Sequence, residues 1–481
     1  MKNNPSSYTT CPNCYGRGKT SRRLRKKVRL QYQRAWAAFE KTKGQGTPPV
    51  RPKRNLMLCL TCSGSGLFPA DDYPVANSTY PHVAIIGGGI GGVALAVACL
   101  HRQIPFTLYE RDGSFDARSQ GYGLTLQQAS KAMQGFGLGT LKEGVNSTRH
   151  VVHTTEGKVV GEWGMRTQVK LKVDKAPKRI NVHIARQSLR LTLLEQLPGQ
   201  ETVQWGHQLV DFKKTEDGKV ALNFEVDGKR KTAVADLVVG ADGIRSTMRR
   251  LLIGEEINPL RYLGVIVILG ICPLSRLENI KSELLDSATV FQTANGNERI
   301  YMMPFASDSI MWQLSFPMTE AAAKALSREG PEALKKEAIR RTPWHEPIPA
   351  ILAATEAKQI SGYPVYDREI LEAAHLEKAG PVTLIGDAAH PMSPFKGQGA
   401  NQALLDALAL ARSISENCRP LSKWREAGIR NRVLVDFELE MLERTAAKVK
   451  DSARAAKFLH SEMALEEGNS PRGRKFRNNG K

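Results

Sequence analysis

Residues 82–110 read HVAIIGGGIGGVALAVACLHRQIPFTLYE, and this stretch decides the fold. The apolar run at residues 82–86 predicts a strand, residues 91–102 predict a helix, and residues 106–110 predict a second strand. Between the first strand and the helix, Gly87, Gly89 and Gly92 fit the pattern GxGxxG, which permits a tight turn and a close backbone approach to a diphosphate. Glu110 ends the second strand, where a carboxylate can accept hydrogen bonds from ribose hydroxyls. The stretch therefore predicts a Rossmann-like dinucleotide-binding unit.

Two later motifs each follow an apolar strand. In the first, residues 236–246 (DLVVGADGIRS) place Asp242 and Gly243 between a buried strand and a helix. In the second, residues 386–401 (GDAAHPMSPFKGQGAN) begin with Gly386 and Asp387 after a strand and lead through a Pro/Gly loop into a helix. The loop amides and the helix start are suited to an electron-rich ring edge.

Together the three motifs resemble the group A FAD-dependent aromatic monooxygenases, the family of para-hydroxybenzoate hydroxylase, salicylate hydroxylase and the tetracycline-inactivating enzymes. The resemblance covers about residues 82–445. It implies bound FAD, NAD(P)H as co-substrate, and O₂. It further implies hydroxylation of a small aromatic or polyketide-like substrate through a flavin C4a-hydroperoxide. An isoprenoid reductase or desaturase and a non-catalytic FAD-fold or zinc adaptor are the alternatives, and a halogenase is disfavoured because no WxWxIP segment is present.

The resemblance also implies roles for individual residues. Gly87, Gly89 and Gly92 would hold the FAD diphosphate, and Glu110 the adenosine ribose. The other implied cofactor contacts are Arg111, Arg118, Arg186, Asp242, Gly243, Gly386, Asp387, Pro394, Gly397, Gly399 and Asn401, the last four lining the isoalloxazine ring. Lys396 departs from the family pattern, in which many relatives have a small residue.

Candidates on the substrate side come from the predicted second sheet and the flavin loop. No Ser/His/Asp nucleophile stands out, as expected where a cofactor carries the chemistry. The main candidates are Trp312, Gln313, Tyr366 and His390, with Met302, Met303, Phe305, Met311 and Phe395 as further ones. For any one of these, core packing is the preferred interpretation, whereas for His390 a structural hydrogen bond and an acid–base role stay equally open. Their aromatic and methionine content favours a flat, apolar substrate.

The expected fold class is α/β, with a Rossmann-like FAD-binding domain interrupted by a β-rich substrate domain. The predicted domains are a basic zinc-finger-like module (1–67), a linker (68–81), the first FAD-binding part (82–264), the substrate domain (265–380), the second FAD-binding part with a long C-terminal helix (381–467) and a basic tail (468–481).

The amino-terminal module contains two CxxCxGxG units. Cys11, Cys14, Cys59 and Cys62 offer four thiolates, which suits tetrahedral Zn²⁺, and the units resemble the zinc fingers of DnaJ-type co-chaperones. Between them, residues 21–41 predict an amphipathic helix with Leu24, Val28, Tyr32, Trp36 and Phe39 on one face and Arg22, Arg23, Lys26, Lys27, Arg29 and Arg34 elsewhere.

Charge is concentrated at the two ends of the chain. The net charge is +21, of which residues 1–58 carry +14 and residues 468–481 carry +5. We expect the basic module to face a protein or another acidic surface; for both basic ends, RNA and anionic lipid are open as partners, as is simple solvation. The sequence shows neither a secretory signal nor an apolar run long enough to span a bilayer. We expect a cytoplasmic protein, with an organelle address left open.

Overall fold

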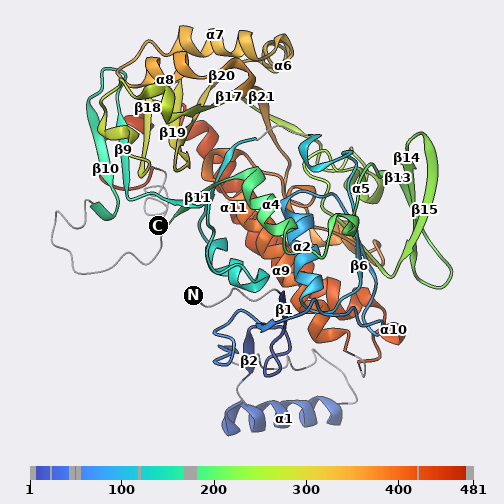
Figure 1. Ribbon diagram of the computed structural model, residues 1–481. Helices are drawn as coiled ribbons and strands as arrows, with labels where there is room; N and C mark the ends of the chain where they lie inside the picture. The colour runs from blue at the N-terminus through green and yellow to red at the C-terminus, as the bar shows by residue number, and fades with distance from the viewer. Residues whose placement is uncertain are drawn as a thin grey trace.

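The computed structural model describes residues 7–21, 24–42, 49, 52, 56–117, 121–166, 181–419 and 422–472. Arg118, Arg22, Arg23 and residues 473–481 of the basic tail, all named above, lie outside them. Figure 1 shows three regions: a body of sheet and helices, a large sheet at the opposite end from the N-terminal module, and the module itself.

The nucleotide-binding body is built on a parallel sheet, as the glycine motif predicts. Its strand order is β12 (Val203–Gln204), β6 (Phe106–Tyr109), β5 (Val83–Ile86), β16 (Leu237–Gly240) and β22 (Val382–Leu384). The two central strands, β5 and β16, are buried along their whole length, which explains their continuous apolar sequences. All three motifs follow strands of this sheet, so the parallel arrangement brings them to one edge.

Helices cover the parallel sheet and connect it to the rest of the molecule. They are α2 (Ile90–Leu100), α4 (Arg186–Leu194), α5 (Thr247–Ile253), α9 (Gly399–Asn417), α10 (Trp424–Ala427) and α11 (Val435–Phe458), the last preceded by a π-helical segment, Arg430–Leu434. α2 packs on α9, and ten of its eleven residues are buried. α2 begins and ends within two residues of the helix predicted over residues 91–102, whereas α10 was not predicted, and the long C-terminal helix begins with the π-helical segment.

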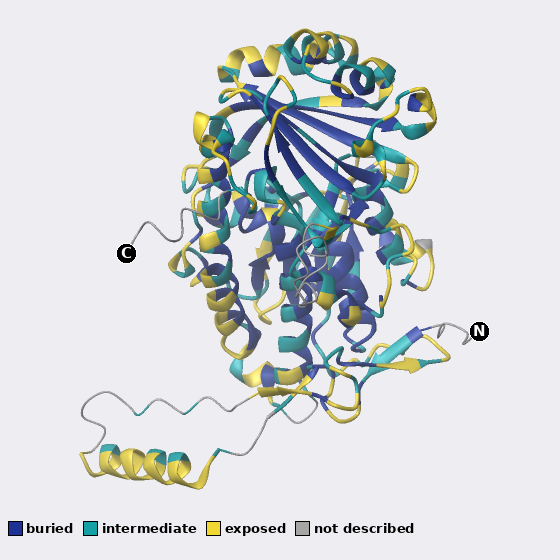
Figure 2. Cartoon of the chain, turned by 90° about the vertical axis from the view of Figure 1, so that its left-hand side faces the viewer, coloured by how far each residue is buried: buried dark blue, intermediate teal, exposed yellow. Residues whose placement is uncertain are grey.

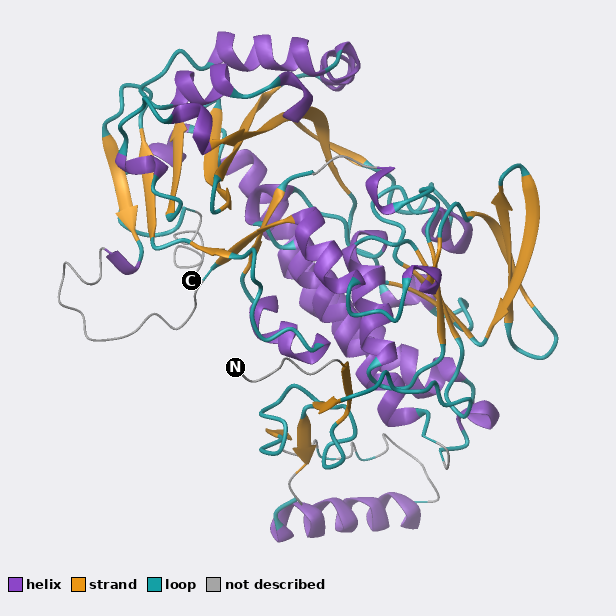
Figure 3. Cartoon of the chain, viewed as in Figure 1, coloured by secondary structure: helices purple, strands orange, loops and turns teal. Residues whose placement is uncertain are grey.

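The second domain is a seven-stranded, mostly antiparallel sheet. Its strand order is β10 (Val159–Trp163), β9 (Arg149–His153), β18 (Thr289–Ala294), β19 (Arg299–Ala306), β20 (Ser309–Pro317), β17 (Arg261–Pro273) and β21 (Ile360–Asp367). β9 and β10 come from the predicted first FAD-binding part, so this sheet draws on more of the chain than residues 265–380. One face packs against α6 (Glu320–Glu329), α7 (Pro331–Arg341) and α8 (Ile348–Ala354), as Figure 3 shows.

Smaller sheets complete the described part of the chain. Two are three-stranded: β7 (Gly123–Leu126), β11 (Val182–Ala185) and β8 (Val145–Asn146); and β13 (Gln208–Lys214), β14 (Val220–Val226) and β15 (Lys229–Ala235). In the module, β1 (Ser7–Thr10) pairs with β4 (Leu67–Ala70), and β2 (Lys19–Ser21) pairs with β3 (Leu56–Leu58). The module helix is α1 (Lys26–Lys41). None of the described helices is both long and apolar enough to cross a bilayer.

Candidate functional site

The glycine turn after β5 is open toward solvent at one position only. A Cβ on Gly92 would lie 1.8 Å from the carbonyl oxygen of Gly87, and a Cβ on Gly87, whose φ is +109°, would lie 2.6 Å from the oxygen of Ala241. These two glycines are therefore required for packing. Gly89, which caps the N-terminus of α2, would meet no atom within 4 Å. The turn thus leaves free space at the N-terminus of α2, where unpaired backbone N–H groups of the helix could bind an anion.

Glu110 lies beside this turn, as the sequence predicts. Its buried carboxylate accepts hydrogen bonds from the backbone N–H groups of Gly88 at 2.6 Å and Asp112 at 3.0 Å. Arg190 donates from Nε to the carbonyl oxygen of Gly88 at 2.7 Å. Arg190 was missed by the sequence reasoning, although it lies one helical turn after Arg186 on α4. Arg111 is exposed next to Glu110.

The helix that follows the second motif forms hydrogen bonds to the backbone of the third motif. The carboxylate of Asp242 accepts from the Ser246 hydroxyl and the Met248 N–H, so it helps fix the start of α5, and burial raises the pKa of this carboxyl. Gly243 has a φ of +82°. From α5, Arg249 donates to the carbonyl oxygens of Ala388 at 3.0 Å and Ala389 at 2.9 Å. Arg249 therefore connects the second motif, with Asp242 and Gly243 (the DG motif), to the third, with Gly386 and Asp387 (the GD motif).

A cavity of about 980 Å³ lies between the loop of the third motif, residues 386–401, and the inner face of the seven-stranded sheet. Asp387 lines it from the loop side, and burial raises the pKa of its carboxyl. The other predicted loop residues on the lining are Pro394, Gly397 and Gly399, together with Lys396. The glycine turn at the N-terminus of α2 does not line this cavity.

Asn401 holds the loop in place and is not part of the cavity lining. Its side-chain amide donates to the carbonyl oxygens of Thr125 and Gly397, both at 2.8 Å. Its oxygen accepts from the N–H groups of Gln127 at 2.8 Å and Ala129 at 3.2 Å. Asn401 thus fastens the loop to the segment after β7. Arg186 is the first residue of α4, and its guanidinium lies 5.8 Å from the centre of the Tyr122 ring.

Strand alternation sorts the substrate-side candidates. Met303 on β19 is paired with Met311 on β20, and both line the cavity, as does Gln313. The intervening pair, Met302 and Trp312, points to the opposite face, where the Trp312 Nε1 donates to the Thr355 hydroxyl at 2.9 Å. Further along the wall, the cavity is lined by Tyr366 and Phe395, whereas Phe305 belongs to a buried cluster.

His390 lies behind the cavity in a buried polar network. Its Nε2 is 2.7 Å from a carboxylate oxygen of Asp406, which also accepts from the N–H of Gly386 at 2.9 Å. Arg444 on α11 donates to the other oxygen of Asp406 at 2.8 Å. Since His390 is absent from the cavity lining, the arrangement favours its structural interpretation.

Arg299 is a cavity residue that the sequence reasoning missed. It is 6% exposed, lines the cavity, and donates from Nε to the Gln292 side-chain oxygen at 2.8 Å. Its guanidinium lies 4.9 Å from the ring centre of Tyr301, and burial lowers its pKa to about 10. No ion pair joins it to an acidic side chain in the described part of the chain. The sequence does not show which face of β19 Arg299 occupies, so its burial at the cavity could not be predicted.

A chain of neutral polar side chains also lines the cavity. His183 Nδ1 lies 3.0 Å from the Thr125 hydroxyl, its Nε2 lies 2.8 Å from the Ser147 hydroxyl, and Ser147 is 3.3 Å from His150 Nε2. Burial lowers the pKa of His183 to about 3 and that of His150 to about 4, so both rings are neutral near pH 7. Sequence spacing does not connect these residues, because Thr125, His183 and His150 lie on three different strands and Ser147 directly follows a fourth, β8.

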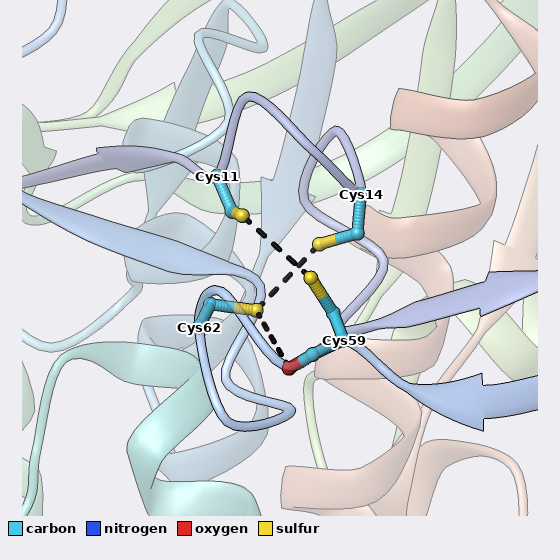
Figure 4. A group of neighbouring side chains, drawn as sticks. All are labelled: Cys11, Cys14, Cys59 and Cys62. Carbon is cyan, nitrogen blue, oxygen red and sulfur yellow. Dashed lines mark hydrogen bonds between the residues drawn. The ribbon is translucent and has the colours of Figure 1, made fainter.

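The four module cysteines converge, as Figure 4 shows. Their sulfur atoms all lie within 4.8 Å of one another. In each CxxCxGxG unit the last glycine donates its N–H to the second cysteine: Gly18 to Cys14 and Gly66 to Cys62, both at 3.2 Å. All four motif glycines have positive φ, which explains the repeat. The geometry suits one tetrahedral metal ion.

The module packs against the C-terminal ends of α2 and α9 through the buried Arg102 and the half-buried Arg412. Arg102, at the end of α2, donates to the carbonyl oxygen of Gly16 from Nε at 3.3 Å and from Nη2 at 3.2 Å. Arg412 on α9 donates to the carbonyl oxygens of Gly64 at 3.2 Å and Ser65 at 2.9 Å. Among the described residues, no carboxylate forms an ion pair with either arginine.

Comparison with known proteins agrees with this geometry. A family described as "FAD binding domain" matches residues 80–421. The aurachin C monooxygenase/isomerase of Stigmatella aurantiaca is 29% identical over 339 residues, covering 69% of this chain and 80% of that protein. The 3-amino-4-hydroxybenzoate 2-monooxygenase PtnB3 of Streptomyces platensis is 29% identical over 331 residues, covering 69% of this chain and 78% of that protein.

Solved structures share the fold. HpxO of Klebsiella pneumoniae, complexed with FAD and uric acid, has a TM-score of 0.64 at 20% identity, covering 81% of this chain and 93% of that chain. A salicylate hydroxylase substrate complex has a TM-score of 0.61 at 22% identity, covering 80% of this chain and 90% of that chain. The match spans both the parallel sheet and the seven-stranded sheet, and the family range begins after the cysteine module.

Proposed function

This chain belongs to the FAD binding domain family, and from that premise we propose that it is an NAD(P)H-dependent FAD monooxygenase that hydroxylates a small aromatic molecule. The observation that carries the proposal is the cavity of about 980 Å³, in which the GD-motif loop faces Tyr301 and Gln313 of the sheet. Its relatives support the reaction type, since several are named FAD-dependent monooxygenases.

The residues present fit the cofactor. FAD, when bound, would supply the redox chemistry, taking electrons from NAD(P)H and delivering one atom of O₂ to the substrate. The open amides at Gly89 would bind its diphosphate, and the Glu110 carboxylate its ribose. Asp387 and the loop Pro394–Gly399 would hold its ring end against the cavity. Met303 and Met311 form an apolar part of the opposite wall, which would help to exclude water.

Arg299 would orient the substrate. A buried guanidinium without an acidic partner is costly unless a ligand supplies the negative charge. We therefore expect a ring bearing a carboxylate or an ionised hydroxyl rather than a wholly apolar one. This refines the sequence expectation of a flat, apolar substrate, because the methionine and tyrosine walls remain suited to a ring.

The first test is the absorbance spectrum of the purified protein, followed by NADH or NADPH addition in air. We expect flavin bands that bleach and then recover, and faster turnover with an accepted phenol. Under ¹⁸O₂ the hydroxylated product should carry one ¹⁸O atom. Turnover that incorporates no ¹⁸O would favour a reductase or desaturase, and a colourless protein that FAD cannot reconstitute would favour the adaptor.

The Arg299→Gln variant tests the substrate class. Binding of 4-hydroxybenzoate and of uncharged 4-methylphenol is followed by perturbation of the flavin spectrum. The variant should bind 4-hydroxybenzoate roughly ten- to a hundredfold more weakly than the parent does, because a charged hydrogen bond is lost. It should bind 4-methylphenol about as tightly as the parent does. Equal losses for both ligands would show that Arg299 acts only on cavity shape.

We also propose that Cys11, Cys14, Cys59 and Cys62 bind one structural Zn²⁺. The convergence of four sulfurs supports the site, and the positive charges of the buried Arg102 and the half-buried Arg412 support its anionic state. Four thiolates around one Zn²⁺ carry a net charge of about −2, which would offset both arginines. The ion would therefore stabilise the contact between the module and helices α2 and α9.

Metal analysis of the purified protein tests this site. We expect about one Zn²⁺ per chain, falling to none when all four cysteines are replaced by serine. Cys272→Ser, which removes a thiol outside the cluster, is the matched control and should leave the zinc content unchanged. Zinc retained in the four-serine variant would place the ion elsewhere.

A further inference from the structure

Helix α1 lies apart from the rest of the protein. Figure 1 shows it beyond the cysteine module, and Figure 2 shows that most of its surface is exposed. None of its residues is buried, and its side-chain hydrogen bond, Trp36 Nε1 to Glu40 at 2.9 Å, stays within the helix. The structure describes no ion pair from this helix to the body. The helix therefore has a surface that no described element covers.

The surface of α1 has two chemically distinct faces. Val28, Tyr32, Trp36 and Phe39 fall on one side at helical spacing, and their rings contact one another, with centroids 6.1 Å apart for Tyr32–Trp36 and 5.9 Å apart for Trp36–Phe39. The opposite side carries Lys26, Lys27, Arg34 and Lys41. Glu40 is the single acidic residue of the helix, which has a net charge of +4.

This separation distinguishes among partners. A single-stranded nucleic acid presents phosphates to the cationic face and bases that can stack on the three rings, but it offers no apolar phase to the aliphatic part of the stripe at Val28. An anionic bilayer surface satisfies both faces, because acyl chains receive the stripe while headgroups attract the cations. Tryptophan and tyrosine at the edge of such a stripe are favoured at the lipid–water boundary.

We propose that α1 is an interfacial helix that docks this protein on an anionic membrane surface. The helix lies outside residues 80–421, so this role is additional to the proposed reaction. In Figure 1 the helix is at the far end of the molecule from the seven-stranded sheet, so docking leaves the catalytic domains clear of the bilayer.

Vesicle sedimentation of the full-length, metal-loaded protein tests the proposal. We expect binding to phosphatidylcholine vesicles that contain phosphatidylglycerol, and little binding to pure phosphatidylcholine. Combined Lys26→Glu, Lys27→Glu and Arg34→Glu should weaken binding to anionic vesicles at least tenfold. The matched control, Lys229→Glu, Arg230→Glu and Lys231→Glu on exposed β15, should bind as the parent does.

A charge-neutral variant separates the membrane from other anionic partners. Trp36→Ala with Phe39→Ala keeps every cation but removes the stripe, and it should also weaken vesicle binding at least tenfold. Vesicle binding unchanged in this variant, or tighter binding of poly(U) than of vesicles, would overturn the proposal in favour of a nucleic-acid surface. Because flavin content and zinc content are measured on the same samples, failure here is distinguishable from failure of the monooxygenase or the metal site.

Discussion

At the residue scale, the three motif glycines have different roles. Gly87 and Gly92 are enclosed by backbone atoms, whereas Gly89 faces open space in the protein alone. Gly89→Asp should therefore leave the fold intact but place a carboxylate where the diphosphate must bind. We expect the purified variant to lose at least nine-tenths of its flavin absorbance, while circular dichroism and the melting temperature of the apoprotein stay close to the parent's.

Gly139→Asp is the matched control for this prediction, because a Cβ there also meets no atom within 4 Å and the residue is exposed. It should retain full flavin content. Gly92→Ala should instead disturb the fold itself, since its Cβ would overlap the Gly87 carbonyl. Full flavin content in Gly89→Asp would refute the assignment of this turn to the diphosphate.

At the element scale, the alternation of β20 separates stability from ligand contact. Trp312 packs under α8 and its neighbours, whereas Gln313 lines the cavity. Trp312→Ala should lower the free energy of unfolding by about 3–5 kcal/mol. Gln313→Met should cost less than about 1.5 kcal/mol but change KM for the aromatic substrate. Urea unfolding and steady-state kinetics check the pair; a stability loss of equal size in both would contradict the assigned faces.

The elements predicted from sequence are those whose local pattern is strong. The strands β5, β16 and β22 are short apolar runs ended by glycine or a Gly-Asp pair, and so their positions were predicted closely. β9 (RHVVH) and β10 (VVGEW) mix charged, aromatic and apolar residues, and β9 pairs in parallel with β18, more than 130 residues away. Such a pairing depends on long-range packing, which periodicity does not report. For the same reason, the positions of Arg299 and His183 at the cavity could not be predicted.

At the scale of the whole molecule, helices α2 and α9 connect the proposed cofactor site to the cysteine module. The parallel sheet and its helices α2 and α9 begin at the cofactor site and end under the cysteine module. Cofactor binding at the proposed site at one end and the proposed metal binding at the other would therefore act on the same pair of helices. The contact between the module and these helices could not be predicted from the sequence motifs, because Arg102 and Arg412 do not belong to any of them.

Buried histidines give the whole molecule a specific response to acid. Burial is the largest cause that lowers the pKa of His101 and His183 to about 3, and of His150, His153 and His460 to about 4, from an ordinary value of 6.5. The unfolded chain therefore binds protons that the folded protein excludes. Stability is fully present above the unfolded pKa of 6.5 and declines as the pH falls from there toward the folded values.

About one pH unit below the unfolded pKa, each such histidine destabilises the fold by about 1.4 kcal/mol. We expect the free energy of unfolding to fall by several kcal/mol between pH of about 7.5 and 5.5, with uptake of protons on unfolding. Urea unfolding at the two pH values, with zinc and FAD saturating, measures the change. Since His183 is fully buried within the Thr125–Ser147 hydrogen bonds, His183→Gln should reduce the pH slope by about one proton. A stability that is flat across this range would mean that these rings are solvated and already titrate in the folded protein.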